Sequence, residues 1–157
     1  MTSELSIQIS ETGKLYKNGN LCYEGELKNN LRHGKGKSYY KNGILCYEGE
    51  FKENIKHGQG KLYYTNGDLF EGEFKENKID GQGKLYYYDN GNLRQEGVLK
   101  NGEFDGQGKL YYEGDLLYEG EFKKSLAHGQ GKTYYNNGTL IHEGGFKNGH
   151  IYLSAKL

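Results

Sequence analysis

The chain has 157 residues, with 21 Lys and Arg against 21 Asp and Glu, so its formal net charge is zero. Net neutrality excludes a general electrostatic attraction to nucleic acid or to an anionic membrane, because both require a basic surface. The chain has 16 Tyr, 26 Gly and no Pro, which indicates aromatic strands joined by many tight turns.

The predicted elements begin with a capping strand in residues 1–12, where Leu5, Ile7 and Ile9 alternate with polar residues. A series of similar segments follows, and a second capping strand with Ile151, Leu153 and Ala155 closes the chain in residues 151–157. The segments span residues 13–35, 36–59, 60–82, 83–107, 108–130 and 131–150. No linker separates them, so we predict one repeat array. The first ten residues show no signal sequence, and we expect a cytoplasmic protein.

Each segment is predicted to be a β-hairpin. In residues 60–82 the tract GKLYY is followed by Asn66-Gly67, a pair that favours a turn, and then by the alternating tract LFEGEFK. The alternation places Phe70 and Phe74 on one face and Glu71 on the other. A two-residue turn would add Tyr63 to the Phe face, whereas a three-residue turn would add Leu62 and Tyr64. We favour the longer turn because it keeps this face apolar.

Stacking the hairpins predicts rows of side chains that run across the sheet. Glycines between the bulky positions leave space in which a neighbouring ring can lie flat over the backbone. The other face mixes lysine and glutamate, and we expect it to be solvated. The predicted apolar row comprises Tyr40, Tyr64, Tyr87, Tyr112 and Tyr135 from first strands and Leu27, Phe51, Phe74, Leu99, Phe122 and Phe146 from second strands.

The stretch His57-Gly58-Gln59-Gly60-Lys61 has the glycine spacing of a phosphate-binding loop. Such a loop must lead into a helix, whose N-terminus faces the anion. This stretch leads into a predicted strand, and similar stretches recur at residues 33–37, 80–84, 105–109 and 128–132. We therefore predict that it is a turn and binds no nucleotide cofactor.

Other candidate chemistry is excluded by the expected spacing. Equivalent positions of adjacent hairpins lie roughly 9–10 Å apart, which is too far for His33 and His57, with their equivalent His128, to share a zinc ion. We expect these histidines to stabilise turns. The same spacing keeps Cys22 and Cys46 apart as free thiols. The repeated Glu-Gly-Glu supplies equal carboxylates on an open sheet rather than one differentiated acid and base, so we predict no enzyme and no metal site.

The combination YEGEFK…HGxGK…YY…NG resembles the MORN repeat, in the form with Asn-Gly-x-Leu that is common in bacterial proteins. The resemblance covers residues 13–150 and implies an all-β fold, an elongated, twisted and curved single-layer antiparallel sheet of stacked hairpins. It also implies a scaffold, a dimerisation element or a partner-binding groove, and phospholipid binding has been proposed for some members. The chain departs from the pattern at Arg94-Gln95, at Val98 and at Gly145.

The leading functional hypothesis is a non-catalytic scaffold that binds a partner chain, a peptide or a second copy of itself through its aromatic face. A single-layer sheet with an apolar face must bury that face against something. The candidate binding residues are Tyr40, Tyr47, Phe51, Tyr64, Phe70, Phe74, Tyr87, Arg94, Tyr112, Tyr118, Phe122 and Tyr135.

Two alternatives stay open at this point. Aromatic cages can hold a quaternary ammonium, so the chain could be a module that binds a small ligand, a carbohydrate or a lipid headgroup. An antitoxin or immunity role rests on the family resemblance alone. Residues 83–107 break the repeat at Arg94, Gln95, Glu103 and Asp105, and this unit is a hypothesis for the location of specificity.

Overall fold

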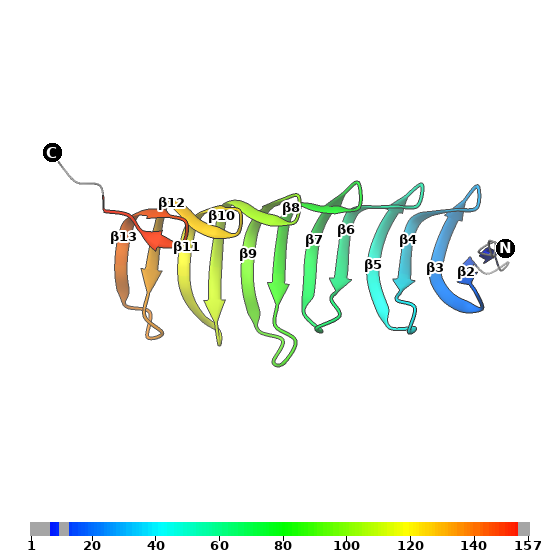
Figure 1. Cartoon of the computed structure of the whole chain (residues 1–157), viewed down its shortest axis with the longest axis horizontal. Coiled ribbons are helices and arrows are strands. Elements are labelled where there is room, and N and C mark those ends of the chain that lie inside the picture. The colour runs from blue at the N-terminus through cyan, green and yellow to red at the C-terminus, as the bar shows by residue number, and fades with distance from the viewer. Residues whose placement is uncertain (1–6, 10–12, 154–157) are drawn as a thin grey trace, which may run out of the picture.

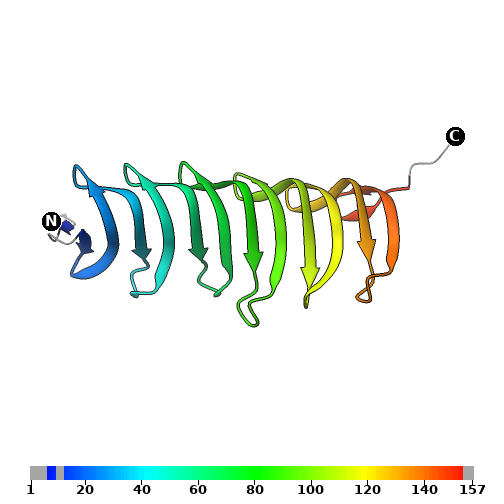
Figure 2. The ribbon, with the colours of Figure 1, turned by 180° about the vertical axis from the view of Figure 1, so that it is seen from behind.

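The computed structural model describes residues 7–9 and 13–153, which form one antiparallel sheet of 14 strands. The strands lie side by side in chain order, so the sheet is an elongated single-layer ribbon with β1 and β14 at opposite ends (Figure 1). The view from behind shows the same bowed strands without a second layer among the described residues (Figure 2). The predicted fold is confirmed. The strands are β1 (Ile7–Ile9), β2 (Lys14–Lys17), β3 (Asn20–Lys28), β4 (Leu31–Tyr39), β5 (Leu45–Lys52), β6 (Ile55–Tyr63), β7 (Leu69–Lys75), β8 (Lys78–Tyr86), β9 (Leu93–Lys100), β10 (Glu103–Tyr112), β11 (Asp115–Lys123), β12 (Leu126–Tyr134), β13 (Leu140–Lys147) and β14 (His150–Ile151).

The ends of the sheet carry short strands. β1 pairs with β2, where Ile9 lies opposite Leu15, and β14 pairs with β13, where Ile151 lies opposite Phe146. Leu5 and Ala155, which we also assigned to capping strands, lie outside the described residues.

One edge of the sheet carries two-residue turns, and the other carries wide loops except at β2–β3 and β10–β11, where two-residue turns also join the strands. Asn66-Gly67 lies in the wide loop Tyr64–Asp68 between β6 and β7, where the Gly67 N–H donates to the Tyr64 carbonyl (2.9 Å). The tight turns lie on the opposite edge, as between β5 and β6, where both Glu53 (φ 50°) and Asn54 (φ 70°) are left-handed. Two consecutive positive φ values are typical of the type I′ turn that matches the twist of a hairpin.

The HGQGK stretch lies within strand β6, so the prediction of a turn there was wrong. β5 and β6 pair Gly49 with Gly60 and Phe51 with Lys56, which leaves residues 57–59 opposite the single residue Glu50. This is a β-bulge, which bends the strand without ending it. His33, His57 and His128 are therefore strand residues rather than turn residues.

A glycine and a glutamate make this bulge possible. Gly58 has φ 62°, a conformation that glycine adopts at no steric cost. A Cβ atom at Gly58 would also lie 2.5 Å from the Glu50 carboxylate. That carboxylate accepts a hydrogen bond from the backbone N–H of Gln59 (3.2 Å). The second glutamate of Glu-Gly-Glu thus satisfies a backbone donor that the bulge leaves unpaired.

The length variation between units also has its origin in a bulge. Ser38 lies opposite Tyr47 and Tyr39 lies opposite Leu45, so Cys46 is an extra residue in β5. In the third unit β6 and β7 pair without a shift, and the loops of both units keep the same length. The equivalent bulge residues are Cys22, Arg94, Leu117 and Ile141.

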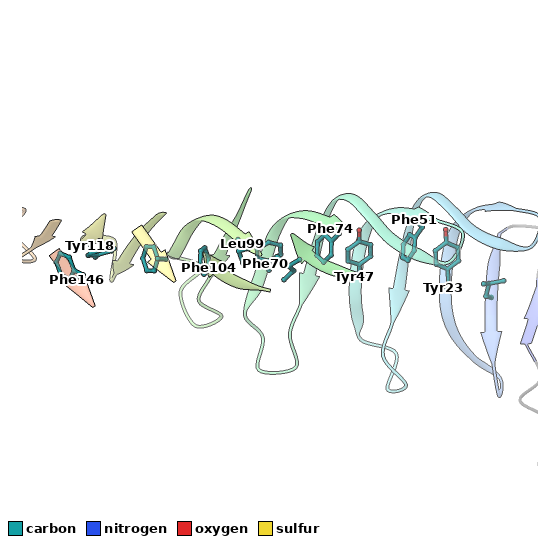
Figure 3. Packing of buried hydrophobic residues seen from close by; sticks show 12 residues of the cluster. Tyr23, Tyr47, Phe51, Phe70, Phe74, Leu99, Phe104, Tyr118 and Phe146 are labelled. Atoms are coloured by element: carbon teal, nitrogen blue, oxygen red, sulfur yellow. The ribbon is translucent and has the colours of Figure 1, made fainter. Parts of the chain in front are cut away.

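The apolar face carries a row of rings over a row of glycines. Phe51, Phe74, Leu99, Phe122 and Phe146 are buried, which confirms their predicted place in the core, and Leu27 packs against them. The row also contains the buried rings of Tyr23, Tyr47, Phe70 and Tyr118, which lie on the same second strands. Figure 3 shows the rings in line along the ribbon. The first-strand positions opposite them are Leu15, Ser38, Leu62, Leu85, Leu110 and Thr133.

The predicted first-strand tyrosines do not belong to this row. Leu62 lies opposite Phe70, as the longer turn required, but strand β6 ends one residue before Tyr64. Tyr64, Tyr112 and Tyr135 are 39%, 49% and 58% exposed. At Tyr64 and Tyr135 the strand ends one residue earlier, so the parity argument did not apply to them. Tyr112 is the last residue of β10, where it pairs with Asp115 beside a two-residue turn.

The tight turns bind each hairpin to the one before it. The N–H of Asn54 donates to the Arg32 carbonyl (2.9 Å), and its Oδ1 accepts from the Arg32 N–H (2.9 Å). Asn77 makes the same pair of bonds with Lys56. An asparagine at this position therefore tolerates the left-handed conformation and also extends the hydrogen-bonded ladder by one rung.

We expect Asn54→Gly to lower the free energy of unfolding by about 1 kcal/mol, because it keeps the turn but removes the side-chain acceptor of the Arg32 N–H. Glu53→Gly is the matched control, because Glu53 is left-handed and its side chain makes no hydrogen bond to a described residue. The control should be neutral or slightly stabilising. Urea denaturation measures both, and equal losses would contradict the role of the asparagine side chain.

Candidate partner-binding trough

The polar face carries a row of alternating lysine and glutamate that crosses the sheet from β2 to β13. The register places one member on each strand, so every lysine lies opposite a glutamate. The row is Lys14, Glu24, Lys37, Glu48, Lys61, Glu71, Lys84, Glu96, Lys109, Glu119, Lys132 and Glu143. We call it the Lys–Glu row.

Most lysines of the Lys–Glu row form ion pairs within it. Lys84 lies 3.5 Å from Glu96 and Lys132 lies 3.3 Å from Glu143. These side chains are partly exposed to solvent, and such pairs contribute about 1 kcal/mol or less. Lys109 differs, because it makes no ion pair with any residue in 7–9 or 13–153.

Tyrosine hydroxyls hold the carboxylates of the row from one side. The Tyr111 hydroxyl donates to Glu96 (2.8 Å), and that of Tyr134 donates to Glu119 (2.6 Å). Burial and the bond to Glu96 raise the pKa of Tyr111 to about 12, and the bond to Glu119, with a smaller effect of burial, raises the pKa of Tyr134 to about 12. The phenols therefore remain neutral hydrogen-bond donors throughout the physiological pH range.

An open trough of about 810 Å³ runs along this face. Its floor is the backbone of the glycine row, since a Cβ atom at these positions would point to the opposite face, as at Gly83, where it would lie 2.3 Å from the Phe70 ring. One wall is the Lys–Glu row from Glu71 onward, and the other consists of Gln59, Gln82, Gln107 and Gln130. The trough is thus lined by backbone, amides and charges of both signs. We had expected this face to be solvated and had not predicted a trough on it.

The candidate residues on the apolar face are not available to a partner. Tyr47, Phe51, Phe70, Phe74, Tyr118 and Phe122 are at most 5% exposed. They pack edge to face, as Tyr47 does against Phe51 and Phe74 with ring centroids 5.1 and 4.9 Å apart. The rings satisfy one another along the ribbon, so the single layer needs no covering chain to bury them. The prediction of an open aromatic docking face is therefore corrected.

The remaining candidates lie on the wide-loop edge or near it. Tyr40, Tyr64, Tyr87, Tyr112 and Tyr135 stand where strands meet loops. Tyr40 donates to the Tyr63 carbonyl (2.8 Å) of the next unit. The five residues stand at five different strand ends rather than gather into one site.

Arg94 has an internal role that the sequence did not reveal. Arg94 is a bulge residue, and its guanidinium reaches the preceding unit, where it lies 3.6 Å from the Asp68 carboxylate. In its own unit, the guanidinium lies 5.3 Å from the centroid of the Tyr87 ring. Asp68 also accepts the backbone N–H of Tyr88 (3.1 Å). The irregularity of residues 83–107 is therefore explained at Arg94 by a clamp between two loops.

Cys22 and Cys46 are free, and the Cys22 thiol donates to the Leu15 carbonyl (3.2 Å). Within residues 7–9 and 13–153, no three His, Cys, Asp or Glu side chains converge as metal ligands would. The same part of the chain contains no helix with the length and apolar character needed to cross a membrane.

The glutamine wall of the trough is what the sequence reasoning overlooked. The repeated Gly-Gln-Gly had been read as turn chemistry, and its glutamine was given no role. With Gly-Gln-Gly inside a strand, alternation directs Gln59 to the face of Lys61, next to Glu73 on β7. The two-residue period of HGQGK was the signal that could have revealed this.

The fold and its trough define an extended β-hairpin repeat protein, in which equivalent side chains form rows along a single sheet. The MORN repeat model matches residues 23–44, 47–69, 70–92, 96–115 and 118–140. These matches cover more than half of the chain, which therefore belongs to the MORN repeat family. The comparison with curated proteins found no match to the chain. MORN repeats generally mediate binding to proteins or membrane lipids and are generally non-catalytic.

Proposed function

We propose that the chain is a non-catalytic scaffold whose trough binds an elongated polypeptide segment that carries charges of both signs. The supporting observation is the continuous trough, which spans β6 to β13 and is lined by backbone, amides and the Lys–Glu row. Its length suits an extended chain or a helix rather than a compact small molecule.

The charge arrangement favours binding over catalysis. Each carboxylate of the Lys–Glu row between Glu71 and Glu119 has a tyrosine donor and a neighbouring lysine. An acid–base reaction requires two groups with separated pKa values, whereas these carboxylates share one environment. A row of equivalent charges of alternating sign instead forms a repeating pattern, and a partner with complementary charges can align with it only in certain registers.

Lys109 supplies the strongest point of attachment in the trough. Its ammonium has no ion-pair partner among the described residues. On the same half of the sheet, the second glutamate of the Glu-Gly-Glu motif is replaced by Val98 in β9 and by Gly145 in β13. A carboxylate of the partner placed at Lys109 would gain an ion pair without breaking one. We therefore expect an acidic side chain of the partner to lie here.

Affinity capture from the source cell tests the proposal with two charge-changing variants. Lys109→Glu should abolish capture of the partner, and Lys109→Gln should weaken it. Lys123→Glu, outside the trough lining, is the control and should retain capture. Circular dichroism confirms that each variant is folded. Retention by Lys109→Glu together with loss by Lys123→Glu would overturn the proposed surface.

A further inference from the structure

The C-terminal edge of the sheet is only partly covered. β14 pairs with the last two residues of β13, and the Tyr152 N–H donates to the Gly145 carbonyl (2.8 Å). Residues 140–144 of β13 have no strand on this side within residues 7–9 and 13–153. Alternate residues of an antiparallel strand direct their backbone groups to the same neighbour, so Glu143 presents its N–H and carbonyl to this edge, as Gly145 does. Such an edge can accept another strand.

Two apolar side chains of β13 are exposed at this edge. Leu140 and Ile141 are each 47% exposed. Residues in the same register positions of the preceding hairpins are all partly buried. They are Leu21, Leu45, Leu69, Leu93 and Leu116 for the first position and Cys22, Cys46, Arg94 and Leu117 for the second. β13 therefore lacks the cover that a following hairpin gives to each earlier second strand.

The glycine row shows the same difference at its last member. Each of the five preceding second-strand glycines faces a glycine of the next strand, as Gly120 faces Gly131, whose Cα would lie 2.5 Å from an added Cβ atom. An added Cβ atom at Gly144 would meet only His142 of its own strand, at 3.0 Å. The space beside Gly144 that a following strand would take is therefore open.

A strand that fits this space has a defined sequence. The five strands that pair with a preceding second strand all contain the motif Gly-Lys-x-Tyr, which starts at residues 36, 60, 83, 108 and 131. Its glycine lies opposite a glycine and its lysine opposite a glutamate. In four units its tyrosine hydroxyl donates to that glutamate. Glu143 accepts no such hydroxyl from the described residues, and its side chain is 59% exposed.

The chain contains this motif a sixth time, at the other end of the ribbon. Gly13-Lys14-Leu15-Tyr16 leads into and includes most of β2, whereas β13 lies near the opposite end of the sheet (Figure 1). The two ends of one ribbon cannot meet, because ten strands lie between β2 and β13. Only a second copy of the chain can bring this motif to β13.

β14 and β2 correspond to different parts of one first strand. The strands β4, β6, β8, β10 and β12 each begin five residues before the glycine of the motif, whereas β2 begins directly after it. β14 pairs with the last two residues of β13 as the first two residues of β12 pair with the last two of β11. β14 thus matches the beginning of a first strand, and β2 matches its end.

We propose that copies of the chain associate head to tail, with β2 of one copy paired to residues 140–144 of another. The register of the preceding hairpins places Gly13 opposite Gly144 and Lys14 opposite Glu143. The Tyr16 hydroxyl then donates to Glu143. This contact joins two different surfaces and leaves one of each free, so it extends into a linear series of copies rather than closing at a dimer.

β1 competes with this association. It pairs with the outer edge of β2, where Ile9 lies opposite Leu15. In the head-to-tail contact His142 of the second copy takes that place opposite Leu15. The incoming β13 must therefore displace β1, a strand of three residues, and association depends on the protein concentration.

Sedimentation velocity of the pure full chain over a concentration series tests the proposal. The sample contains no other protein, so the result does not depend on the function proposed for the trough. We expect monomers at low concentration and a growing series of dimers, trimers and larger species at high concentration. A monomer at every concentration, or growth that stops at the dimer, would refute head-to-tail association.

Charge-changing variants test the register of the contact. Glu143→Lys and Lys14→Glu each place like charges opposite one another, and each alone should weaken association about tenfold. An equal mixture of the two variants should restore it, because opposite charges face each other again. Glu48→Lys is the matched control, since Glu48 pairs with Lys37 (3.6 Å) inside the array, and it should associate as the native chain does. Circular dichroism verifies folding, and a mixture no stronger than its components would overturn the register.

A variant in β1 tests the competition. Gln8 is the central residue of β1 and pairs with Tyr16, and Gln8→Pro removes an N–H from this short strand. Association should become about tenfold stronger or more. Unchanged association would show that β13 does not take the place of β1 on β2, and would overturn the proposed contact.

Discussion

Gly60→Ala is expected to lower the free energy of unfolding by about 3 kcal/mol, a large cost for one methyl group. A Cβ atom at Gly60 would lie 2.4 Å from the Tyr47 hydroxyl oxygen and 2.5 Å from a ring carbon. Tyr47 cannot turn aside, because it is fully buried between Phe51 and Phe74. The methyl group must therefore displace a ring or spread two strands. Urea denaturation measures the loss.

Two further variants separate this steric effect from the conformational preference of glycine. Gly43→Ala changes a loop glycine with φ 82° and nothing within 4 Å of the added Cβ atom, so it should cost only about 1 kcal/mol for the left-handed backbone. The double variant Gly60→Ala with Tyr47→Leu should be less destabilised than the sum of the single variants. Strict additivity would show that the glycine and the ring are not coupled.

Phe74→Ala is expected to lower the free energy of unfolding by about 3–5 kcal/mol. Phe74 is 3% exposed and touches Tyr47 of the preceding hairpin, with ring centroids 4.9 Å apart, and Phe70 of its own strand, with centroids 5.7 Å apart. Removing it breaks the row of rings near the middle of the ribbon. Because each hairpin of such an array contacts only its neighbours, the two halves should also lose cooperativity.

The expected signature is a broader urea transition with a smaller dependence on denaturant, in addition to a lower midpoint. Tyr135→Ala removes a ring that is 58% exposed on the wide-loop edge, and its effect should stay within about 0.5 kcal/mol. A sharp, unshifted transition for Phe74→Ala would contradict the view that the rings hold the single layer together.

The regular parts of the fold were predictable because strand alternation is a local property. The tract LFEGEFK placed Phe70, Gly72 and Phe74 on one face, and the sheet has them there. The same reasoning failed at Tyr64, which lies beyond the end of its strand, and at HGQGK, where a bulge resembles a turn in sequence. Glycine next to a polar residue is compatible with both, and only the pairing of the flanking strands distinguishes them.

The candidate site was harder to predict than the fold. The aromatic residues were correctly assigned to one face, but whether that face is open depends on how the rings pack. Tyr47 lies along its own strand over Gly49 and Gly60, and in that orientation it meets the next ring instead of pointing outward. The trough arises on the other face from the glycine floor and the course of the strands, which no single repeat encodes.

The sequence alone determined that the chain is a repeat array of antiparallel hairpins with a glycine row. The repeat period and the two-residue alternation can both be read directly from the amino-acid sequence. Tertiary structure alone decided which surface is free, because burial depends on neighbours in adjacent hairpins. The physical reason is visible at Ala127 and Lys56. These two residues occupy equivalent places, yet Lys56 lies 4.8 Å from the centroid of Tyr47, whereas Ala127 lines a cavity beside Tyr118.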